Sequence, residues 1–344
     1  MAETDERWKS LWNDVEDYEQ TVNALLAFAA LLVHDGTSRR AGSEFGFGRR
    51  MTRPIGAVSD VTPDLVAQKS LDYGVAAEAK KSLSRDRSHW EQEVAQVREY
   101  AGGLVGWWTQ DETIRAYDTV LLIHIARGRP FAKLLRSDEQ REGGAAGVAF
   151  KVVEFSQMTE AQVNFFFRSE EGTLSDPELG QRLDDGVPVP LDSVLQSFPT
   201  VKYYDSPPPV VLLIRDLWMN VFPSMLSDGE YDEGLKATKI KASVSKVTDE
   251  LQLASGSKAK ALSRDSRSAE FPQKSWVRQA FDWLVSKRMA LPPGEESDEY
   301  TILYRPIRKD VLHRLIDKEV SATKKTPTPA EQTALPFPDS QSSG

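Results

Sequence analysis

The chain has 344 residues, a formal net charge of −9, four histidines and no cysteine. This length suggests two domains, or three, with ample chain to bury a core. The lack of cysteine excludes disulfides, thiolate zinc sites and cysteine nucleophiles, and it is compatible with the cytoplasm, the location we expect.

Residues 5–33 are predicted to form a long amphipathic helix. Apolar residues recur at three- and four-residue steps, as in a helix with one face on a core: Trp8, Leu11, Trp12, Val15, Tyr18, Val22, Leu25 and Leu26. Its acidic start is unlike a signal peptide, and its apolar run ALLAFAALLV is about half of what a membrane helix needs. We therefore expect no membrane association.

A loop rich in Gly and Arg follows, SRRAGSEFGFGRRMTRP. Arginines beside a charged site are suited to phosphate contacts: Arg39, Arg40, Arg49, Arg50 and Arg53. The alternative is an ordinary surface loop whose arginines bind nothing specific.

The next stretch carries two carboxylates and a lysine. Asp64 opens the apolar run DLVAQ, and Glu78 and Lys80 close the run YGVAAEAK. Two strands joined by a tight turn at residues 69–72 cover the 14 positions between the carboxylates. Such a hairpin can bring both carboxylates to one end of a sheet. Strand alternation then points Glu78 and Lys80 to the same face.

Converging carboxylates need a neutralising partner, because like charges at close range repel and are partly desolvated. Mg²⁺ suits such a pair, since it takes oxygen ligands and is typically held by carboxylates together with substrate phosphates; Mn²⁺ is the alternative. An ammonium beside the ion is suited to orienting or deprotonating an attacking water. The pattern therefore indicates a site that hydrolyses a phosphodiester. The other reading is that Asp64 caps a turn and Glu78, Lys80 and Lys81 form a solvated strand end.

These residues resemble a known signature. Pro63-Asp64 and Glu78-Ala79-Lys80 look like the PD-(D/E)XK motif of the restriction-endonuclease-like nuclease superfamily. The resemblance implies an α/β fold with a core of helix, three strands, helix and strand, a mixed sheet flanked by helices, over residues 5–126. The chain has no cysteine, so the iron–sulfur cluster of some relatives is not carried over.

The helix predicted at residues 90–104 adds to the resemblance. Gln96 and Tyr100 are one helical turn apart and share a face, similar to the QxxxY element of the RecB/Cas4-like branch. The resemblance implies that they contact the nucleic acid or support the lysine. Residues 80–87, with four basic side chains and one Asp, are suited to a phosphate backbone running past the site.

The resemblance also implies roles for individual residues. The metal ligands would be Asp64, Glu78 and the Ala79 carbonyl, with Glu44 as an outer acidic ligand and Glu19 as the alternative to it. Lys80 would position or activate the water, and it forms the catalytic set with Asp64 and Glu78. Substrate would be held by Gln96, Tyr100, Lys81 and Arg85.

Further strands complete the first predicted domain, residues 1–170. A buried strand is expected at 119–126, where His124 is more typical of a packed core histidine than of a ligand. A pair of strands follows at 147–157 and 161–169. Residues 171–209 are acidic and rich in proline, which is typical of a connector.

The C-terminal part, residues 210–320, reads as a basic module. Helices are predicted at 210–222, 241–253, 275–291 and 308–320, with a hairpin at 291–306. Residues 236–278 carry ten Lys or Arg against four acidic residues. Helix, loop, helix and hairpin is the layout of a winged helix-turn-helix, which binds either DNA or protein. Residues 321–344 form a tail of Thr, Pro, Ser and Gln that we expect to be disordered.

The sequence therefore predicts an α/β protein with a restriction-endonuclease-like core and a mainly α, winged-helix-like C-terminal domain. The predicted function is that of a Mg²⁺-dependent DNA nuclease in restriction, repair or anti-phage defence, acting as a homodimer or within a larger complex. The alternative is a DNA-binding regulator, or a structural subunit of a complex, whose nuclease-like domain is inactive.

Overall fold

The structure is a computed structural model. The residues it describes are 2–33, 46–48, 53–54, 56, 58, 61–68, 73–80, 87–101, 103–105, 116–126, 130–133, 150–158, 164–190, 192, 206–254, 272–294, 297–307 and 310–322. The chain divides into two compact units. The larger unit comprises residues 16–208 and 245–277, and the smaller unit comprises residues 1–15, 209–244 and 278–344.

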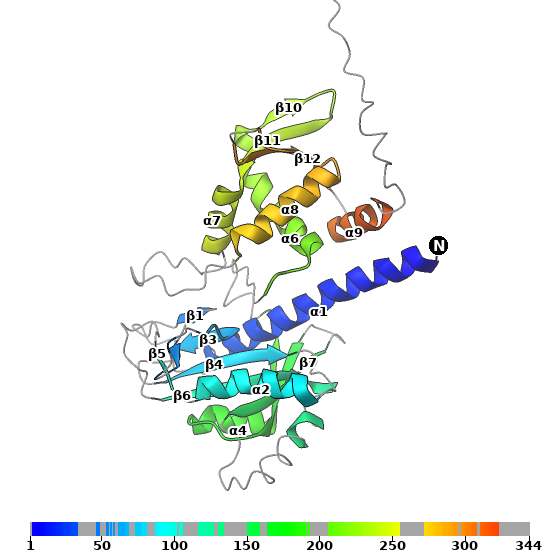
Figure 1. Ribbon diagram of the computed structural model, residues 1–344. Coiled ribbons are helices and arrows are strands. Elements are labelled where there is room, and N and C mark those ends of the chain that lie inside the picture. Colours follow the sequence, from blue (N-terminus) through cyan, green and yellow to red (C-terminus); the bar gives the residue numbers. More distant parts are fainter. Residues whose placement is uncertain are drawn as a thin grey trace, which may run out of the picture. The chain divides into compact units, whose positions relative to one another are not determined.

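A seven-stranded mixed sheet forms the larger unit, with the strand order β1-β3-β4-β6-β7-β8-β9 (Figure 1). Strands β4, β6 and β7 run parallel to one another, and the remaining neighbours pair antiparallel. The strands are β1 Gly46–Gly48, β3 Leu65–Gln68, β4 Tyr73–Lys80, β6 Ala116–His124, β7 Lys151–Met158, β8 Asn164–Glu171 and β9 Val187–Pro190. A separate two-stranded sheet pairs β2 (Arg53–Pro54) with β5 (Leu104–Val105). The predicted α/β class is confirmed as a mixed sheet flanked by helices.

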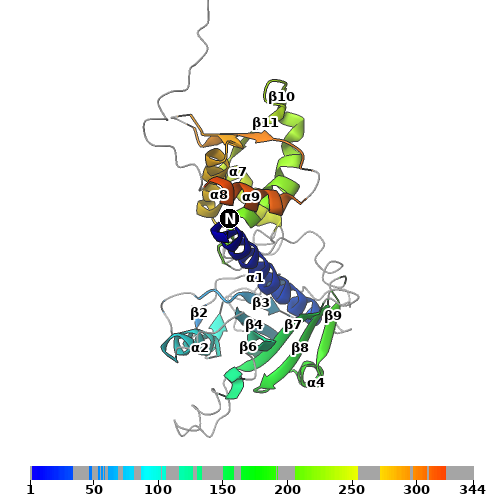
Figure 2. The same ribbon diagram turned by 90° about the vertical axis from the view of Figure 1, so that its right-hand side faces the viewer.

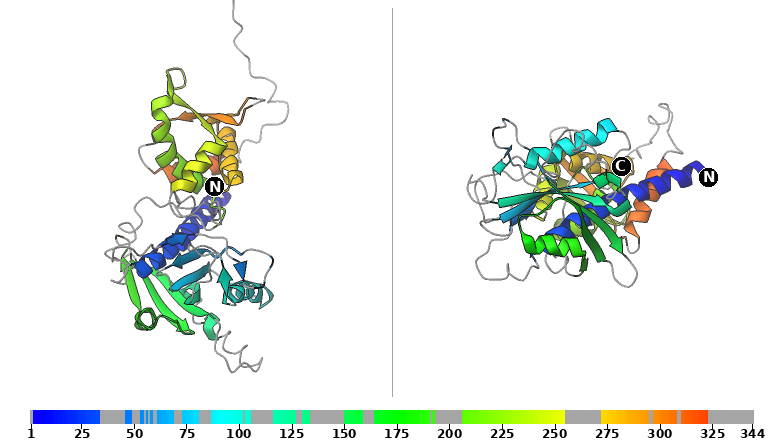
Figure 3. Two further views of the ribbon diagram at one scale, coloured as in Figure 1. Left: turned by 90° about the vertical axis from the view of Figure 1, so that its left-hand side faces the viewer. Right: turned by 90° about the horizontal axis from the view of Figure 1, so that it is seen from below.

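Helices cover both faces of this sheet (Figure 3, right). Helix α2, Arg87–Ala101, lies on one face, and helices α1, Ala2–Val33, and α4, Pro177–Asp185, lie on the other. The alternation of side chains along the strands produces the two cores. On β4, Val75 and Ala77 pack with α1, whereas Ala76 packs with Tyr100 on the opposite face.

Helix α1 confirms the predicted N-terminal helix and changes character along its length. Within the larger unit, every residue from 24 to 32 is buried. A helix that is apolar all round belongs inside a protein, which explains the run ALLAFAALLV. The first fifteen residues belong to the smaller unit, where Trp8 and Trp12 stack on each other and make tilted ring contacts with His313 of helix α9, Val311–Ala322.

The segment predicted as an irregular connector differs from that prediction in its first half. Residues 177–190 form α4 and β9, and β9 pairs with β8 at the edge of the seven-stranded sheet (Figure 2). Asp176 caps α4 by accepting the backbone N–H groups of Glu178 and Leu179, with Pro177 in the first turn. The prolines of β9 are tolerated because an edge strand needs donors on only one side.

The smaller unit contains a four-stranded antiparallel sheet in the order β10-β11-β13-β12. Its strands are β10 Glu230–Asp232, β11 Ala237–Ser243, β12 Ala290–Leu291 and β13 Glu299–Tyr304. Its core is aromatic and includes Trp218, Phe222, Phe281, Tyr300 and Tyr304, each in ring contact with another of the set.

One apolar segment of the smaller unit, Val210–Asp228, is long and apolar enough to cross a membrane. It is not a single regular helix: α6, Val210–Asp216, continues as a π-helical turn over Leu217–Val221 and a 3₁₀ turn over Phe222–Asp228. More than half of it is buried, and Trp218 donates its indole N–H to the carbonyl of Arg305 at 3.0 Å. The segment therefore packs as part of this unit's core.

The predicted helix at 241–253 is wrong at its start. Residues 237–243 form β11, and helix α7 runs only over Val244–Ala254. Ile240 and Ala242, two residues apart, are buried on one face of this strand, which lies between two neighbours. Helix α9, Val311–Ala322, and the hairpin of β12 and β13 confirm the predictions. The helix predicted at 275–291 ends early: α8 runs over Lys274–Ser286, and residues 290–291 form β12, which pairs with β13. The tail beyond residue 322 lies outside the described residues.

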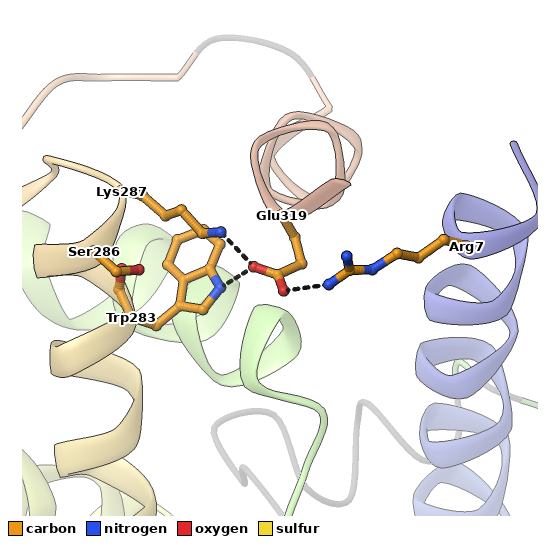
Figure 4. A network of polar contacts seen from close by, with 5 residues as sticks. All are labelled: Arg7, Trp283, Ser286, Lys287 and Glu319. Atoms are coloured by element: carbon orange, nitrogen blue, oxygen red, sulfur yellow. Dashed lines mark hydrogen bonds and ion pairs between the residues drawn. The ribbon is translucent and has the colours of Figure 1, made fainter. Parts of the chain in front are cut away.

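A half-buried carboxylate in the smaller unit is surrounded by donors (Figure 4). Glu319 of α9 accepts hydrogen bonds from the Lys287 ammonium and the Trp283 indole N–H, each at 2.7 Å, and from the Arg7 guanidinium at 3.1 Å. Lys287 also lies over the Trp283 ring, 5.3 Å from its centroid. The Glu319 cluster, Glu319 with Arg7, Trp283 and Lys287, joins α9 to α8 and to the start of α1.

Candidate functional site

The two predicted strands of the motif form an antiparallel hairpin. Leu65 pairs with Ala77 and Gln68 with Gly74, so that the ladder between β3 and β4 ends just after Asp64. Pro63 has no N–H to offer, and the backbone N–H of Ala79 is bonded instead by the Asp64 carboxylate, at 2.9 Å from Oδ2. The Asp64 side chain therefore lies at the same strand end as Glu78, as the sequence predicted.

Glu78 and Lys80 project from the face of β4 that α2 covers. The Lys80 ammonium donates to Oε1 of Glu78 at 2.9 Å. Glu78 is almost fully buried, with 3% exposed, whereas 22% of the Lys80 side chain is exposed. The Ala79 side chain points the other way, into the core with α1. One end of this ion pair is therefore open to solvent, and the other is fixed inside the protein.

Helix α2 brings Gln96 and Tyr100 to the same carboxylate. The Tyr100 hydroxyl donates to Oε2 of Glu78 at 3.2 Å, and the Gln96 amide donates to the Tyr100 hydroxyl at 2.9 Å. Tyr100 is fully buried. The Tyr100 hydroxyl contacts Glu78, the candidate metal ligand, so Tyr100 is placed to support the site. The predicted contact of Tyr100 with substrate would require its hydroxyl to become accessible.

The pKa of the Tyr100 hydroxyl reflects both its burial and the two nearby carboxylates. Burial raises its pKa well above the usual value, the negative charge of Glu78 raises it further, and the charge of Asp64 adds to this. The hydrogen bond from Gln96 acts in the opposite direction without reversing the shift. Tyr100 therefore stays protonated and acts as a donor to Glu78.

Both carboxylates of the candidate site are buried, with Asp64 7% and Glu78 3% exposed. Among the described residues, Lys80 pairs with Glu78, and Asp64 accepts the backbone N–H of Ala79. Within the described residues, no group of three or more His, Asp or Glu could hold a metal ion. Two carboxylates and a backbone carbonyl are nevertheless the small protein ligand set typical of Mg²⁺, which keeps waters and binds substrate phosphates. The donor chemistry of Asp64, Glu78 and Ala79 therefore fits that ion.

Three of the predicted site residues fall outside the described residues: Glu44, Lys81 and Arg85. The arginine side chains of the 38–54 loop also lie outside them. Glu19, the alternative to Glu44, is a half-buried residue of α1. The structure therefore brings together Asp64, Glu78, Ala79, Lys80, Gln96 and Tyr100, and it leaves the remaining assignments as predictions.

Two residues near the candidate site, the buried Glu154 and the partly buried Tyr117, were not predicted from the sequence. Glu154 on β7 lies in one cross-strand row with Lys80 and Ile123, and its carboxylate pairs with Arg168 of β8. Burial, and then the charge of Glu170, raise the pKa of Glu154 against the lowering effect of Arg168. A lone acid inside the apolar run KVVEFS was the available signal. The second residue, Tyr117, lies on β6 below the end of α2 and packs with Tyr100.

Comparisons with known proteins found no matching family model, no similar curated protein and no similar solved structure. The functional assignment therefore depends on the contacts of the site itself.

Proposed function

We propose that the chain is a metal-dependent nuclease that hydrolyses phosphodiester bonds in DNA. The observation that carries the proposal is the convergence of two buried carboxylates, Asp64 and Glu78, on one strand end beside the partly exposed ammonium of Lys80. Burial of like charges costs free energy that a structural role would not require. A divalent cation is the partner that compensates it.

The order of elements supports a restriction-endonuclease-like core. Apart from β2 and β5, which form their own two-stranded sheet, the chain order is α1, β1, β3, β4, α2 and β6, and the strands lie side by side in the order β1-β3-β4-β6. The resemblance implies this succession of helix, three strands, helix and strand. The carboxylates stand at the start of its second strand and near the end of its third.

Each side chain then has a role that follows from its contacts. Asp64 and Glu78 hold the metal together with the Ala79 carbonyl, and Tyr100 and Gln96 fix the orientation of Glu78. Bound Mg²⁺ or Mn²⁺ supplies Lewis-acid stabilisation of the phosphoryl oxygens. Lys80, whose ammonium is anchored by Glu78 and partly exposed, orients the attacking water or accepts its proton.

The C-terminal elements support a contribution to DNA binding. The order along the chain, β11, α7, α8, β12 and β13, with β13 paired to both β11 and β12, is similar to that of a winged helix-turn-helix, although residues 245–277 group with the larger unit. Arg278 and Gln279 are exposed on α8, the second of the two helices. In such modules the second helix enters the major groove, so we propose that this face adds affinity for duplex DNA.

The test is cleavage of supercoiled plasmid and of linear DNA by the wild type and Lys80→Ala, with Mg²⁺, with Mn²⁺ and with EDTA. We expect the wild type to cut only with metal and Lys80→Ala to be folded but at least about 100-fold slower, the scale of acid–base contributions. Lys239→Ala is the matched control, because Lys239 is also a strand lysine paired to a carboxylate, Asp232, at 2.7 Å. Equal activity of Lys80→Ala and the wild type would overturn the proposal.

A second candidate function is a DNA-binding regulator, or a structural subunit, with an inactive nuclease-like unit. The observation in its favour is that both oxygens of Glu78 already accept hydrogen bonds, from Lys80 and from Tyr100. Protein that shifts DNA without Mg²⁺ and never cuts it would support the regulator. A stable protein partner, with weak and salt-sensitive DNA binding, would support the subunit.

A further inference from the structure

Tyr117 of β6 joins the C-terminal end of α2 to the sheet. Its hydroxyl donates to the backbone carbonyl of Tyr100 and accepts the backbone N–H of Gly103 at 2.9 Å. Its ring packs against the cluster of Ala76, Tyr100 and Leu104. One side chain therefore binds the last turn of α2 and the residue that leaves it.

Such a contact matters because the last carbonyl groups of a helix have no partner within the helix. The chain leaves α2 through Gly103, whose φ of +110° is in the region that favours glycine. The polar groups of this exit are satisfied by a hydroxyl from another element, which ties the end of the helix to a fixed point on β6. Burial raises the pKa of Tyr117 to about 12, so its hydroxyl remains a donor at neutral pH.

Tyr117 lies on the strand next to the one that carries Glu78. Tyr117 pairs with Gly74 on β4, and Glu78 lies four residues further along the same strand, on the same face. The two strands that carry the site are therefore also the strands that fix the helix above it.

The hydrogen bond from Tyr100 of α2 to the Glu78 carboxylate is close to the upper limit of length. The Tyr100 hydroxyl lies 3.2 Å from Oε2 of Glu78, which is long for a hydrogen bond from a hydroxyl to a carboxylate. A small outward movement of the last turn of α2 would break it. Tyr117 holds the backbone of Tyr100, and the side chain of the same Tyr100 makes the contact with Glu78.

We propose that Tyr117 is a positioning residue of the site: it holds α2 so that Tyr100 reaches and orients Glu78. Its consequence for metal binding rests on the proposed function. Groups behind a metal ligand usually contribute about 10- to 100-fold to metal affinity. Tyr117 acts one step further back, through Tyr100, so its removal is expected at the lower end of that range.

The experiment is a titration of the full chain with Mn²⁺ alone, followed by electron paramagnetic resonance, for the wild type and Tyr117→Phe. We expect about a tenfold loss of affinity in Tyr117→Phe. Tyr73→Phe is the matched control, because Tyr73 lies on β4 and donates its hydroxyl to Asp118 at 2.6 Å, with its ring packed on the opposite face. It should bind Mn²⁺ within about twofold of the wild type. An equal loss in both variants would overturn the proposal.

A double-mutant cycle with Tyr100→Phe separates positioning from general packing. If Tyr117 acts through the Tyr100 hydroxyl, the double variant binds Mn²⁺ no more weakly than Tyr100→Phe alone. Losses that multiply would mean that the two tyrosines act independently, and the proposal would fall.

Failure of the proposed function gives a different pattern. In that case the wild type itself binds no Mn²⁺ and cuts no DNA. The positioning role is then judged by thermal unfolding of the same four proteins: coupled shifts in Tm for Tyr100→Phe and Tyr117→Phe support it, and additive shifts overturn it.

Discussion

The candidate site and the Glu319 cluster both withdraw carboxylates from solvent, and they surround them differently. Glu319 accepts from two cations, Lys287 and Arg7, and from the Trp283 indole N–H. At the candidate site, Glu78 accepts from Lys80 and from the Tyr100 hydroxyl, and a second carboxylate, Asp64, accepts the backbone N–H of the next residue, Ala79. One region brings two cations to one carboxylate, and the other brings two carboxylates to one strand end.

The difference teaches how to separate a structural carboxylate from a functional one. A structural carboxylate is expected to be matched by its donors, because an unmatched buried charge costs free energy. A site that must bind a cation needs unmatched negative charge before the cation arrives. The comparison therefore predicts that neutralising substitutions change stability in opposite directions in the two regions.

The largest effect is expected for Asp64→Asn. The amide oxygen can still accept the N–H of Ala79, but the charge is lost, so cleavage should fall at least about 100-fold if a metal contributes several kcal/mol. Removal of one of two like charges should at the same time stabilise the metal-free protein by about 1 kcal/mol. Activity assays and denaturant unfolding without metal measure the two effects.

Asp118→Asn is the control for this substitution in the same unit. Asp118 accepts hydrogen bonds from the Tyr73 hydroxyl and from both the backbone N–H and the hydroxyl of Ser175, so donors satisfy both of its carboxylate oxygens. Its neutralisation should lower stability and leave cleavage intact. If Asp64→Asn also lowered stability, repulsion between the two carboxylates of the candidate site would be disproved.

Glu319→Gln is expected to have the opposite effect on stability. The charged partners Lys287 and Arg7 would lose their anion, and hydrogen bonds to charged groups contribute about 2 kcal/mol. Unfolding in denaturant, followed by tryptophan fluorescence, should show this loss while cleavage remains unchanged. Stability equal to that of the wild type would remove the distinction between the two regions.

The dependence of stability on pH gives a further test of the Glu319 cluster. Burial alone raises the pKa of Glu319, but hydrogen bonds from Lys287 and Trp283 and the nearby positive charges outweigh it, so that the pKa lies below its ordinary value of 4.5. A lowered pKa means that the stabilisation is complete above about 4.5 and is lost as the pH falls further.

Thermal unfolding between pH 6 and about pH 3 checks this dependence. The wild type should lose stability below about pH 4.5, and Glu319→Gln should lose less over the same window because its side chain does not titrate. Parallel curves for the two proteins would show that Glu319 is not a source of the acid sensitivity.

Local patterns in the sequence were sufficient for the motif. Strand alternation predicted that Glu78 and Lys80 share a face, and helical spacing predicted that Gln96 and Tyr100 do. The hairpin that brings Asp64 to Glu78 followed from two apolar runs with a short turn between them. These features depend on neighbours in the chain, which periodicity reports directly.

Features that depend on distant partners could not be predicted. The role of Tyr117 depends on the contact of its hydroxyl with the end of α2, and the ion pair of Glu154 depends on Arg168 of the next strand. The acidic, proline-rich composition of residues 171–209 concealed α4 and β9, whose burial comes from the sheet and from α1. Tertiary contacts decide such segments against their local composition.

The smallest effect separates the two cations of the Glu319 cluster. Arg7 is 41% exposed and Lys287 11% exposed, so solvent screens the first contact far more than the second. Arg7→Ala should lower the unfolding free energy by about 0.5 kcal/mol, as exposed pairs do, and Lys287→Ala by about three times as much. Denaturant unfolding of the two variants provides the test. If the losses were equal, burial would not be what gives these contacts their strength. The burial of Asp64 and Glu78 would then no longer argue that two carboxylates are held at one strand end for a cation.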